Sequence, residues 1–373
     1  MQASTISNLA RPDDVAAPRS TSLPTRHEYN MKRVEIIRPD DWHVHFRDGE
    51  LLSRVVPDSA RQFARAIAMP NLAPPVTTTD QALAYRQRIQ AAAPPGFQAL
   101  MTLYLTDDTG ADEILRAKDS AQVHGVKLYP AGATTNSASG ITDMARAASA
   151  LSAMQECGLP LLVHGEVVDK EVDVFDRERV FIERVLGPLL ERFPDLRVVF
   201  EHVTTSEAVG FVLKGPDTLA ATITAHHLLL SRNDLFSGGL RPHHYCLPVL
   251  KRERHRRALV AAATGGSGKF FLGTDSAPHA RTDKESACGC AGIYTAHAAI
   301  ELYASVFEAA DSLHELEAFA SLNGPRFYEL PVNEARITLE RRSWWVPERI
   351  PYPGGELVPF AAGEQLAWTL RQS

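Results

Sequence analysis

Residues 38–48 are Arg38-Pro39-Asp40-Asp41-Trp42-His43-Val44-His45-Phe46-Arg47-Asp48, a run in which polar and apolar residues alternate from residue 41 onward. Successive side chains of an extended strand point to opposite faces, so His43, His45 and Arg47 are predicted to project together. Trp42, Val44 and Phe46 are predicted to pack behind them. Two neutral imidazoles on one strand can bind a single Zn2+, although a hydrogen-bonded pair of core histidines gives the same pattern. Any further metal ligands must come from later in the chain.

The bulk composition favours a protein that acts on a small molecule. The chain has 373 residues, of which 45% are hydrophobic, so it can bury a large core. Barrels of this length are often single domains. The formal net charge of -6 argues against a nucleic-acid or anionic membrane surface, since both need concentrated positive charge.

The cysteines and the apolar runs suggest a reducing, cytoplasmic setting. Four cysteines in so long a chain do not make a disulfide framework: Cys157, Cys246, Cys288 and Cys290. Cys288-Gly289-Cys290 lacks the second pair that a zinc ribbon needs, so these two thiols are predicted to bind no metal. The sequence contains no stretch typical of a transmembrane span or a secretory signal.

The first thirty residues differ from the rest of the chain. Residues 1–30 carry Ser, Thr, Pro and Arg without periodic apolar positions, which predicts a disordered extension. A transit peptide is disfavoured by Asp13, Asp14 and Glu28, and Met31 is an alternative start. Residues 31–373 are predicted to form a single barrel domain with the C-terminal segment packed on it.

After residue 30, short apolar runs alternate with helix-like stretches, the pattern of repeated βα units. Eight runs have the length of buried strands: 34–45, 64–70, 98–105, 125–129, 160–164, 198–203, 219–225 and 269–275. Helical spacing is found at 80–92, 112–122, 143–156, 173–192, 206–214, 252–263, 298–310 and 313–322. The pattern predicts an α/β fold, a (β/α)8 TIM barrel.

Polar residues follow the apolar runs at the points where a barrel enzyme carries its chemistry, the C-terminal ends of the strands. The residues at these ends are His43, His45, Lys127, His164, His202 and Asp275. One such histidine could be an ordinary core residue, but their recurrence at strand ends predicts a metal centre. Burial should lower the pKa of Lys127 and leave a nucleophilic amine, unless this lysine reaches the surface. Such an amine can take up CO2, and the resulting carbamate can bridge two metal ions.

Several motifs together resemble the dihydroorotases of the short bacterial type, within the metal-dependent amidohydrolase superfamily. The resemblance runs from about Val34 to the C-terminus. It rests on residues 39–48, Met69-Pro70-Asn71-Leu72, Lys127-Leu128-Tyr129-Pro130, His164-Gly165-Glu166, Glu201-His202 and Gly273-Thr274-Asp275-Ser276-Ala277-Pro278-His279.

The resemblance implies a binuclear zinc centre and a substrate. His43, His45 and Asp275 would hold one zinc, His164 and His202 the other, and carboxylated Lys127 would bridge them. Substrate contacts are implied for Arg47, Asn71, Leu247, His279 and Ala291, and for Thr134 and Thr135 of a mobile loop over residues 131–140. The implied reaction is reversible cyclisation of N-carbamoyl-L-aspartate to L-dihydroorotate in pyrimidine synthesis, with Asp275 moving the proton. A homodimer is implied as well.

Two other functions fit parts of this pattern. Hydantoinases and allantoinases share the metal centre, but they add a β-sandwich built from both sides of the barrel, and only about thirty weakly patterned residues precede the first run here. A non-catalytic relative would have lost ligands, whereas all six are present. His226-His227 and His243-His244 lie outside the matched set, so ordinary structural roles are predicted for them.

Overall fold

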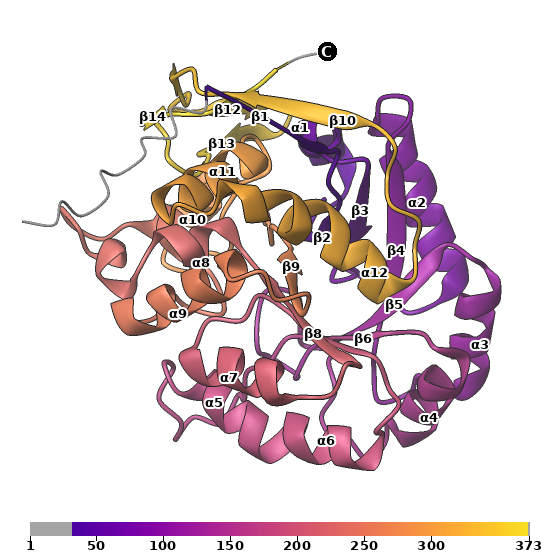
Figure 1. The fold of residues 1–373 in the computed structure, drawn as a ribbon. Coiled ribbons are helices and arrows are strands. Elements are labelled where there is room, and N and C mark those ends of the chain that lie inside the picture. The colour runs from indigo at the N-terminus through magenta and orange to yellow at the C-terminus, as the bar shows by residue number, and fades with distance from the viewer. Residues whose placement is uncertain (1–31, 372–373) are drawn as a thin grey trace, which may run out of the picture. The chain divides into compact units, whose positions relative to one another are not determined.

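Eight parallel strands form the centre of the fold within residues 32–371, the part of the chain that the computed structural model describes. They lie next to one another in chain order (Figure 1). Their bounds are β2 (Asp41–Val44), β3 (Arg65–Ala68), β4 (Gln98–Tyr104), β5 (Val123–Leu128), β6 (Leu161–Val163), β7 (Val198–Phe200), β8 (Leu219–Ile223) and β9 (Phe270–Leu272). The predicted (β/α)8 barrel is confirmed.

Helices follow the strands and surround the barrel (Figure 1). Their bounds are α1 (Leu52–Gln62), α2 (Thr79–Ala92), α3 (Ala111–Asp119), α4 (Ala148–Cys157), α5 (Arg177–Phe181), α6 (Gly187–Arg192), α7 (Ser206–Lys214), α8 (Ala225–Leu229), α9 (Glu253–Thr264), α10 (Arg281–Lys284), α11 (Ala299–Ala309) and α12 (Asn323–Tyr328). Short 3-10 turns lie at Gly49–Leu51, Arg232–Leu235, Pro242–His244 and Leu313–Glu315, and π turns at Ile182–Leu186 and Ala318–Leu322.

Several predicted elements differ from the observed ones. The run 34–45 is two strands in different sheets, because Arg38 and Pro39 separate β2 from an outer strand. The predicted helix 173–192 is divided by a π turn, and the stretch 313–322 contains a 3-10 and a π turn rather than one α-helix. Helix α1, with Pro57 in its interior, lies outside the predicted helical stretches.

The barrel is closed between β9 and β2 by hydrogen bonds at the ends of the two strands. Asp275 N donates to His43 O at 2.8 Å, and His45 N donates to Ser276 O at 3.0 Å. The Asp41 carboxylate accepts from Thr274 N at 2.9 Å and from Thr274 Oγ1 at 2.6 Å. The closure therefore brings the two histidines of β2 beside Asp275.

Alternating positions of the strands divide the core in two. Residues facing the helices belong to one large cluster. The inward residues form a smaller one together with Tyr328 of α12: Trp42, Ile67, Met69, Leu100, Leu162, Val199, Ala220 and Phe271. Trp42 stacks on Tyr328 with ring centroids 4.4 Å apart. The prediction that Trp42 packs with Val44 and Phe46 is therefore wrong. The β2–β3 register is irregular between Asp41 and Val44, which turns Trp42 into the barrel.

Antiparallel strands from both ends of the described chain lie outside the barrel. Strand β1 (Arg33–Ile37) pairs with β10 (Arg336–Glu340), which pairs with β15 (Thr369–Leu370). Two short pairs accompany them: β11 (Trp344–Trp345) with β14 (Gln365–Leu366), and β12 (Ile350–Tyr352) with β13 (Gly355–Leu357). Residues before the first barrel strand thus do contribute to a small outer sheet.

The predicted disordered extension, residues 1–30, lies outside the described residues. Within the described part, no helix combines the length and the apolar character needed to cross a membrane.

Candidate active site

The ends of β2 and β9 bring three of the predicted ligands together. His43 Nε2 lies 3.4 Å from His45 Nε2. Asp275 Oδ1 lies 3.0 Å from His45 Nε2 and 3.4 Å from His43 Nε2. All three side chains are buried. Two imidazole nitrogens facing each other and a carboxylate at such distances are a donor set suited to a divalent cation.

The other two histidines continue the cluster across the barrel mouth. The His43 and His202 ring centroids are 5.0 Å apart, and those of His202 and His164 are 4.9 Å apart. Burial lowers the pKa of His45 and of His202 well below the ordinary value. The positive charge of Arg47 lowers the pKa of His45 further, and that of Lys127 lowers the pKa of His202. These imidazoles are therefore neutral at physiological pH, which is the form that binds metals.

Neighbouring polar groups hold one nitrogen of each of three histidines and leave the other for a ligand. Glu201 Oε2 lies 2.9 Å from His43 Nδ1, and Asn71 Oδ1 lies 2.8 Å from His45 Nδ1. Glu166 Oε2 lies 2.9 Å from His164 Nε2. Such partners fix the ring orientation and tautomer of metal-binding histidines.

Lys127 points into the barrel from β5, in register with Tyr104 of β4 and Leu162 of β6. Its side chain is fully buried, and its Nζ has no hydrogen-bond partner among the described residues. Burial lowers the pKa of Lys127 to about 8, although the charges of Glu201 and Asp275 raise it. The alternative that this lysine reaches the surface is therefore wrong. About one amine in ten is then uncharged at pH 7, far more than for an exposed lysine.

Three site residues have backbone conformations that side chains other than glycine rarely adopt. The φ angles are +60° at Arg47, +39° at His202 and +44° at Asp275. Non-glycine residues in this region cost on the order of 1–3 kcal/mol each and are concentrated at functional sites. The strands end in these turns, which direct the three side chains over the barrel mouth.

Hydrogen bonds connect His45, a predicted metal ligand, with the predicted substrate residues. Asn71, which contacts His45, also donates through Nδ2 to Thr135 O at 3.0 Å. Thr135 Oγ1 donates to Ala291 O at 3.3 Å. His279 Nε2 lies 3.0 Å from Ala291 O and 2.9 Å from an Arg47 guanidinium nitrogen.

The remaining predicted substrate residues lie in neighbouring loops. Leu247 is half-buried, two residues beyond Tyr245 in the segment after Pro242–His244. Thr134 N donates to Ser137 Oγ at 2.8 Å. The loop 131–140 is closed on itself by such bonds, among them Ser137 N to Thr134 O and Gly132 N to Ser137 O. Its predicted mobility stays a prediction.

Several residues at the site were not among the predicted site residues. Glu201 contacts the predicted ligand His43, and Glu166 contacts the predicted ligand His164. The available sequence signal was that Glu201 directly precedes His202 and that Glu166 follows His164 by two residues. Tyr129 follows Lys127 on the same face of the chain, and its ring lies 5.0 Å from Lys127 Nζ. Its hydroxyl is buried without a partner among the described residues, as is that of Tyr104.

The unpaired polar atoms fit a bound metal centre. Within residues 32–371, Lys127 Nζ and His202 Nδ1 are both buried and have no hydrogen-bond partner. Buried polar atoms in native proteins nearly always have partners, so two such atoms on predicted metal ligands fit a bound ion. Nitrogen and oxygen donors of this kind are those that borderline divalent cations prefer.

The amidohydrolase family model matches residues 36–337. This chain belongs to the amidohydrolase family. It is 66% identical over 340 residues to the dihydroorotase of Methylobacillus flagellatus, covering 91% of this chain and 99% of that one. It also resembles solved dihydroorotases of Campylobacter jejuni (36% identity, TM-score 0.84) and of Saccharomyces cerevisiae in complex with 5-fluoroorotic acid (35%, TM-score 0.85). Each match covers 91% of this chain and 98% of the other. Within the amidohydrolases, the chain therefore groups with the dihydroorotases, as the sequence motifs predicted.

Proposed function

We propose that this amidohydrolase is a dihydroorotase, which reversibly closes N-carbamoyl-L-aspartate to L-dihydroorotate and water in pyrimidine synthesis. The observation that carries the proposal is the run of contacts from His45 through Asn71, Thr135 and Ala291 to His279 and Arg47. It joins a metal-binding cluster to a cation suited to a substrate carboxylate. The high identity to a dihydroorotase over nearly the whole chain supports the same function.

The proposal includes two Zn2+ ions. His43, His45 and Asp275 would hold one, His164 and His202 the other, and Lys127 carboxylated on Nζ would bridge them. The buried, partner-free Nζ and the lowered pKa of Lys127 support the carbamate, because only the uncharged amine reacts with CO2. Metals bound there would supply an activated water near neutral pH and polarise the amide carbonyl of the substrate.

Asp275 is proposed to move the proton. In the hydrolytic direction its carboxylate would accept a proton from the attacking water and give it to the departing ring nitrogen. Its Oδ1 lies 3.0 Å from His45 Nε2, so the carboxylate stands at the point where the activated water would be held. The strained turn at this residue holds the carboxylate toward His43 and His45.

Arg47 is proposed to bind the α-carboxylate of the substrate. It is held by Nε donating to Pro278 O at 3.2 Å and by the contact with His279. The yeast dihydroorotase named above was solved with 5-fluoroorotic acid, a ligand with a comparable carboxylate. Burial, with the Arg47 charge next, lowers the pKa of His279 to about 3, so this imidazole stays neutral and can act as a hydrogen-bond partner.

A hydantoinase or allantoinase is the alternative. Strand β1, which precedes the barrel, pairs with β10 in a small outer sheet. The shortness of the sequence before the barrel is therefore a weaker argument against these two enzymes. Arg47 is the stronger argument against them, because their cyclic amide substrates have no carboxylate for its guanidinium group to bind.

Zinc analysis of the purified protein together with a dihydroorotate hydrolysis assay tests the proposal. Less than one equivalent of metal and no turnover would overturn it.

We expect Arg47→Lys to retain the metals but to raise KM by on the order of ten-fold, because a point charge cannot form a planar two-bond fork with a carboxylate. Steady-state kinetics with dihydroorotate measure this. Arg88→Lys is the matched control, since Arg88 is half-exposed and pairs with Asp48. An unchanged KM for Arg47→Lys would remove this residue from the substrate site.

We expect the equilibrium to shift with pH. Ring closure releases a carboxylate oxygen as water and consumes a proton, so lower pH favours dihydroorotate and higher pH favours carbamoyl aspartate. The product ratio at equilibrium, approached from both sides at several pH values, measures this. A ratio that does not vary with pH would mean that the reaction is not this condensation.

We expect Thr134→Ala with Thr135→Ala to lower kcat/KM about ten-fold with metal content unchanged, the loss of roughly two hydrogen bonds. The loop 131–140 lies beside Asn71 and Ala291, where closure would exclude water. Ser139→Ala, at an exposed position of the same loop, is the control. Turnover of the double variant at the parent rate would make the loop a simple connection.

Assembly as a homodimer stays a prediction from the family resemblance, and a cytoplasmic setting stays a prediction from the cysteine content.

A further inference from the structure

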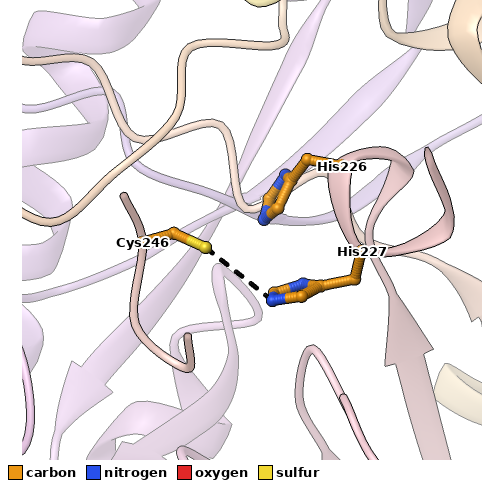
Figure 2. A group of neighbouring side chains, drawn as sticks. All are labelled: His226, His227 and Cys246. Atoms are coloured by element: carbon orange, nitrogen blue, oxygen red, sulfur yellow. Dashed lines mark hydrogen bonds between the residues drawn. The ribbon is translucent and has the colours of Figure 1, made fainter. Parts of the chain in front are cut away.

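A second cluster of potential ligands lies outside the site described above. His226 and His227 stand in the first turn of α8, directly after β8, and Cys246 lies in the segment that follows Pro242–His244. The two rings and the sulfur point toward a common space (Figure 2). One donor atom from each residue lies within 4.8 Å of the other two. Their exposed fractions are 0%, 2% and 2%.

His226 is the residue that ordinary packing does not explain. Its side chain is completely buried, and neither ring nitrogen has a hydrogen-bond partner among the described residues. Leaving a buried polar group unpaired costs about 1–3 kcal/mol, so such a group calls for a ligand. The ring centroid lies 4.5 Å from that of His227, and the side chain is directed into the space beside Cys246 (Figure 2).

The spacing of one sulfur and one nitrogen donor suits a tetrahedral ion. Cys246 Sγ lies 3.7 Å from His227 Nε2. Pro248 O lies 3.0 Å from the same nitrogen and 3.3 Å from the sulfur. Around a tetrahedral zinc ion with ordinary bond lengths, a sulfur and a nitrogen donor are separated by about 3.5 Å, close to the distance between Cys246 Sγ and His227 Nε2. Pro248 O lies closer to both atoms than a fourth ligand would, so it would have to move outward slightly to bind the ion.

Hydrogen bonds alone account for only part of this arrangement. His227 Nε2 and the Cys246 thiol could both donate to Pro248 O, and Thr224 Oγ1 lies 2.7 Å from His227 Nδ1. That pattern satisfies His227 and Cys246 without an ion. It leaves both nitrogens of His226 unpaired, however, so it does not explain why an imidazole is buried there.

We propose that His226, His227 and Cys246 bind one thiophilic cation of the zinc type, with Pro248 O available as a fourth donor. The structural role that the sequence alone suggests for His226-His227 is thereby replaced by metal binding. On binding, the Cys246 S–H bond breaks, a sulfur–metal bond forms and the proton passes to solvent. Two imidazoles and a thiolate are the donors that such ions prefer.

Cys246 carries its proton until a metal displaces it. Burial raises the pKa of the Cys246 thiol, and the charges of Asp275 and Glu166 act in the same direction, while Lys284 and Lys251 oppose the shift. Lys284 Nζ itself donates to Tyr245 O, next to Cys246 in the chain, at 2.8 Å. The ion would join α8 to the segment that carries Leu247, so its role in this proposal is to hold that segment in place.

The test uses Co2+, because sulfur bound to Co2+ gives an intense near-ultraviolet charge-transfer band and nitrogen or oxygen donors do not. The proposed catalytic centre has no sulfur ligand. Cys288 and Cys290 could bind cobalt themselves, since their sulfurs lie 3.6 Å apart. The background protein is therefore Cys288→Ser with Cys290→Ser. Cobalt is supplied in the growth medium because the site is buried.

We expect the background protein to show the thiolate band and to contain one cobalt more than the same protein carrying Cys246→Ser, which should lose the band. His226→Gln in that background should weaken or abolish the band with the thiol still present. Circular dichroism checks that each variant is folded. If Cys246→Ser does not fold, the comparison of the background protein with His226→Gln is the test. No band in the background protein, or a band unchanged by His226→Gln, would overturn the proposal. Neither result depends on the reaction that the enzyme catalyses.

Discussion

Lys127→Ala is expected to lower turnover by on the order of a thousand-fold or more, because two metal ions contribute several kcal/mol to such a reaction. The variant removes the only residue proposed to bridge both ions, so metal content should fall with activity. Elemental analysis and a dihydroorotate hydrolysis assay on the same samples measure the two effects together.

Two comparisons separate the carbamate from simple packing. Lys127→Met keeps an apolar stem in the barrel but cannot take up CO2, so it should be as inactive as the alanine variant. A small carboxylate such as acetate should partly restore the alanine variant, where it has room to bind. Lys118→Ala, at an exposed position of α3, controls for loss of a lysine. Two bound metals and full turnover in Lys127→Ala without additives would rule out the carbamate.

Asp275→Asn is expected to lower kcat by about a hundred- to ten-thousand-fold, the range for loss of a general acid–base group. The amide has nearly the same shape as the carboxylate, so the turn and the barrel closure should survive. Rate measurements should therefore show a larger loss in kcat than in substrate affinity.

The control for Asp275→Asn is Asp283→Asn, an exposed carboxylate on the same stretch of chain. Metal analysis of both variants is needed, because Asp275 Oδ1 also lies within reach of His43 and His45. An Asp275→Asn protein that retained both metals and the parent kcat would exclude this carboxylate as the proton carrier.

The fold could be predicted because its signals are local and repeated. Each barrel strand is a short apolar run, and the pattern of run and helix recurs along the chain. The outer strand β1 was merged with β2 although Pro39 and Asp40, which lie between them, are residue types that commonly end a strand. Trp42 was assigned to the wrong cluster because a register irregularity cannot be read from alternation.

The sequence by itself determined the barrel, the family and the residue types at the strand ends, because strand length, periodicity and motif spacing are properties of neighbouring residues. Only the tertiary structure decided which atoms meet. The Glu201 carboxylate lies beside His43, and hydrogen bonds lead from Asn71 through Thr135 to Ala291, so residues of different strands and loops meet. The same packing buries the ring of His226 without a hydrogen-bond partner among the described residues. Such contacts depend on barrel closure and on turns with positive φ, which no local pattern specifies.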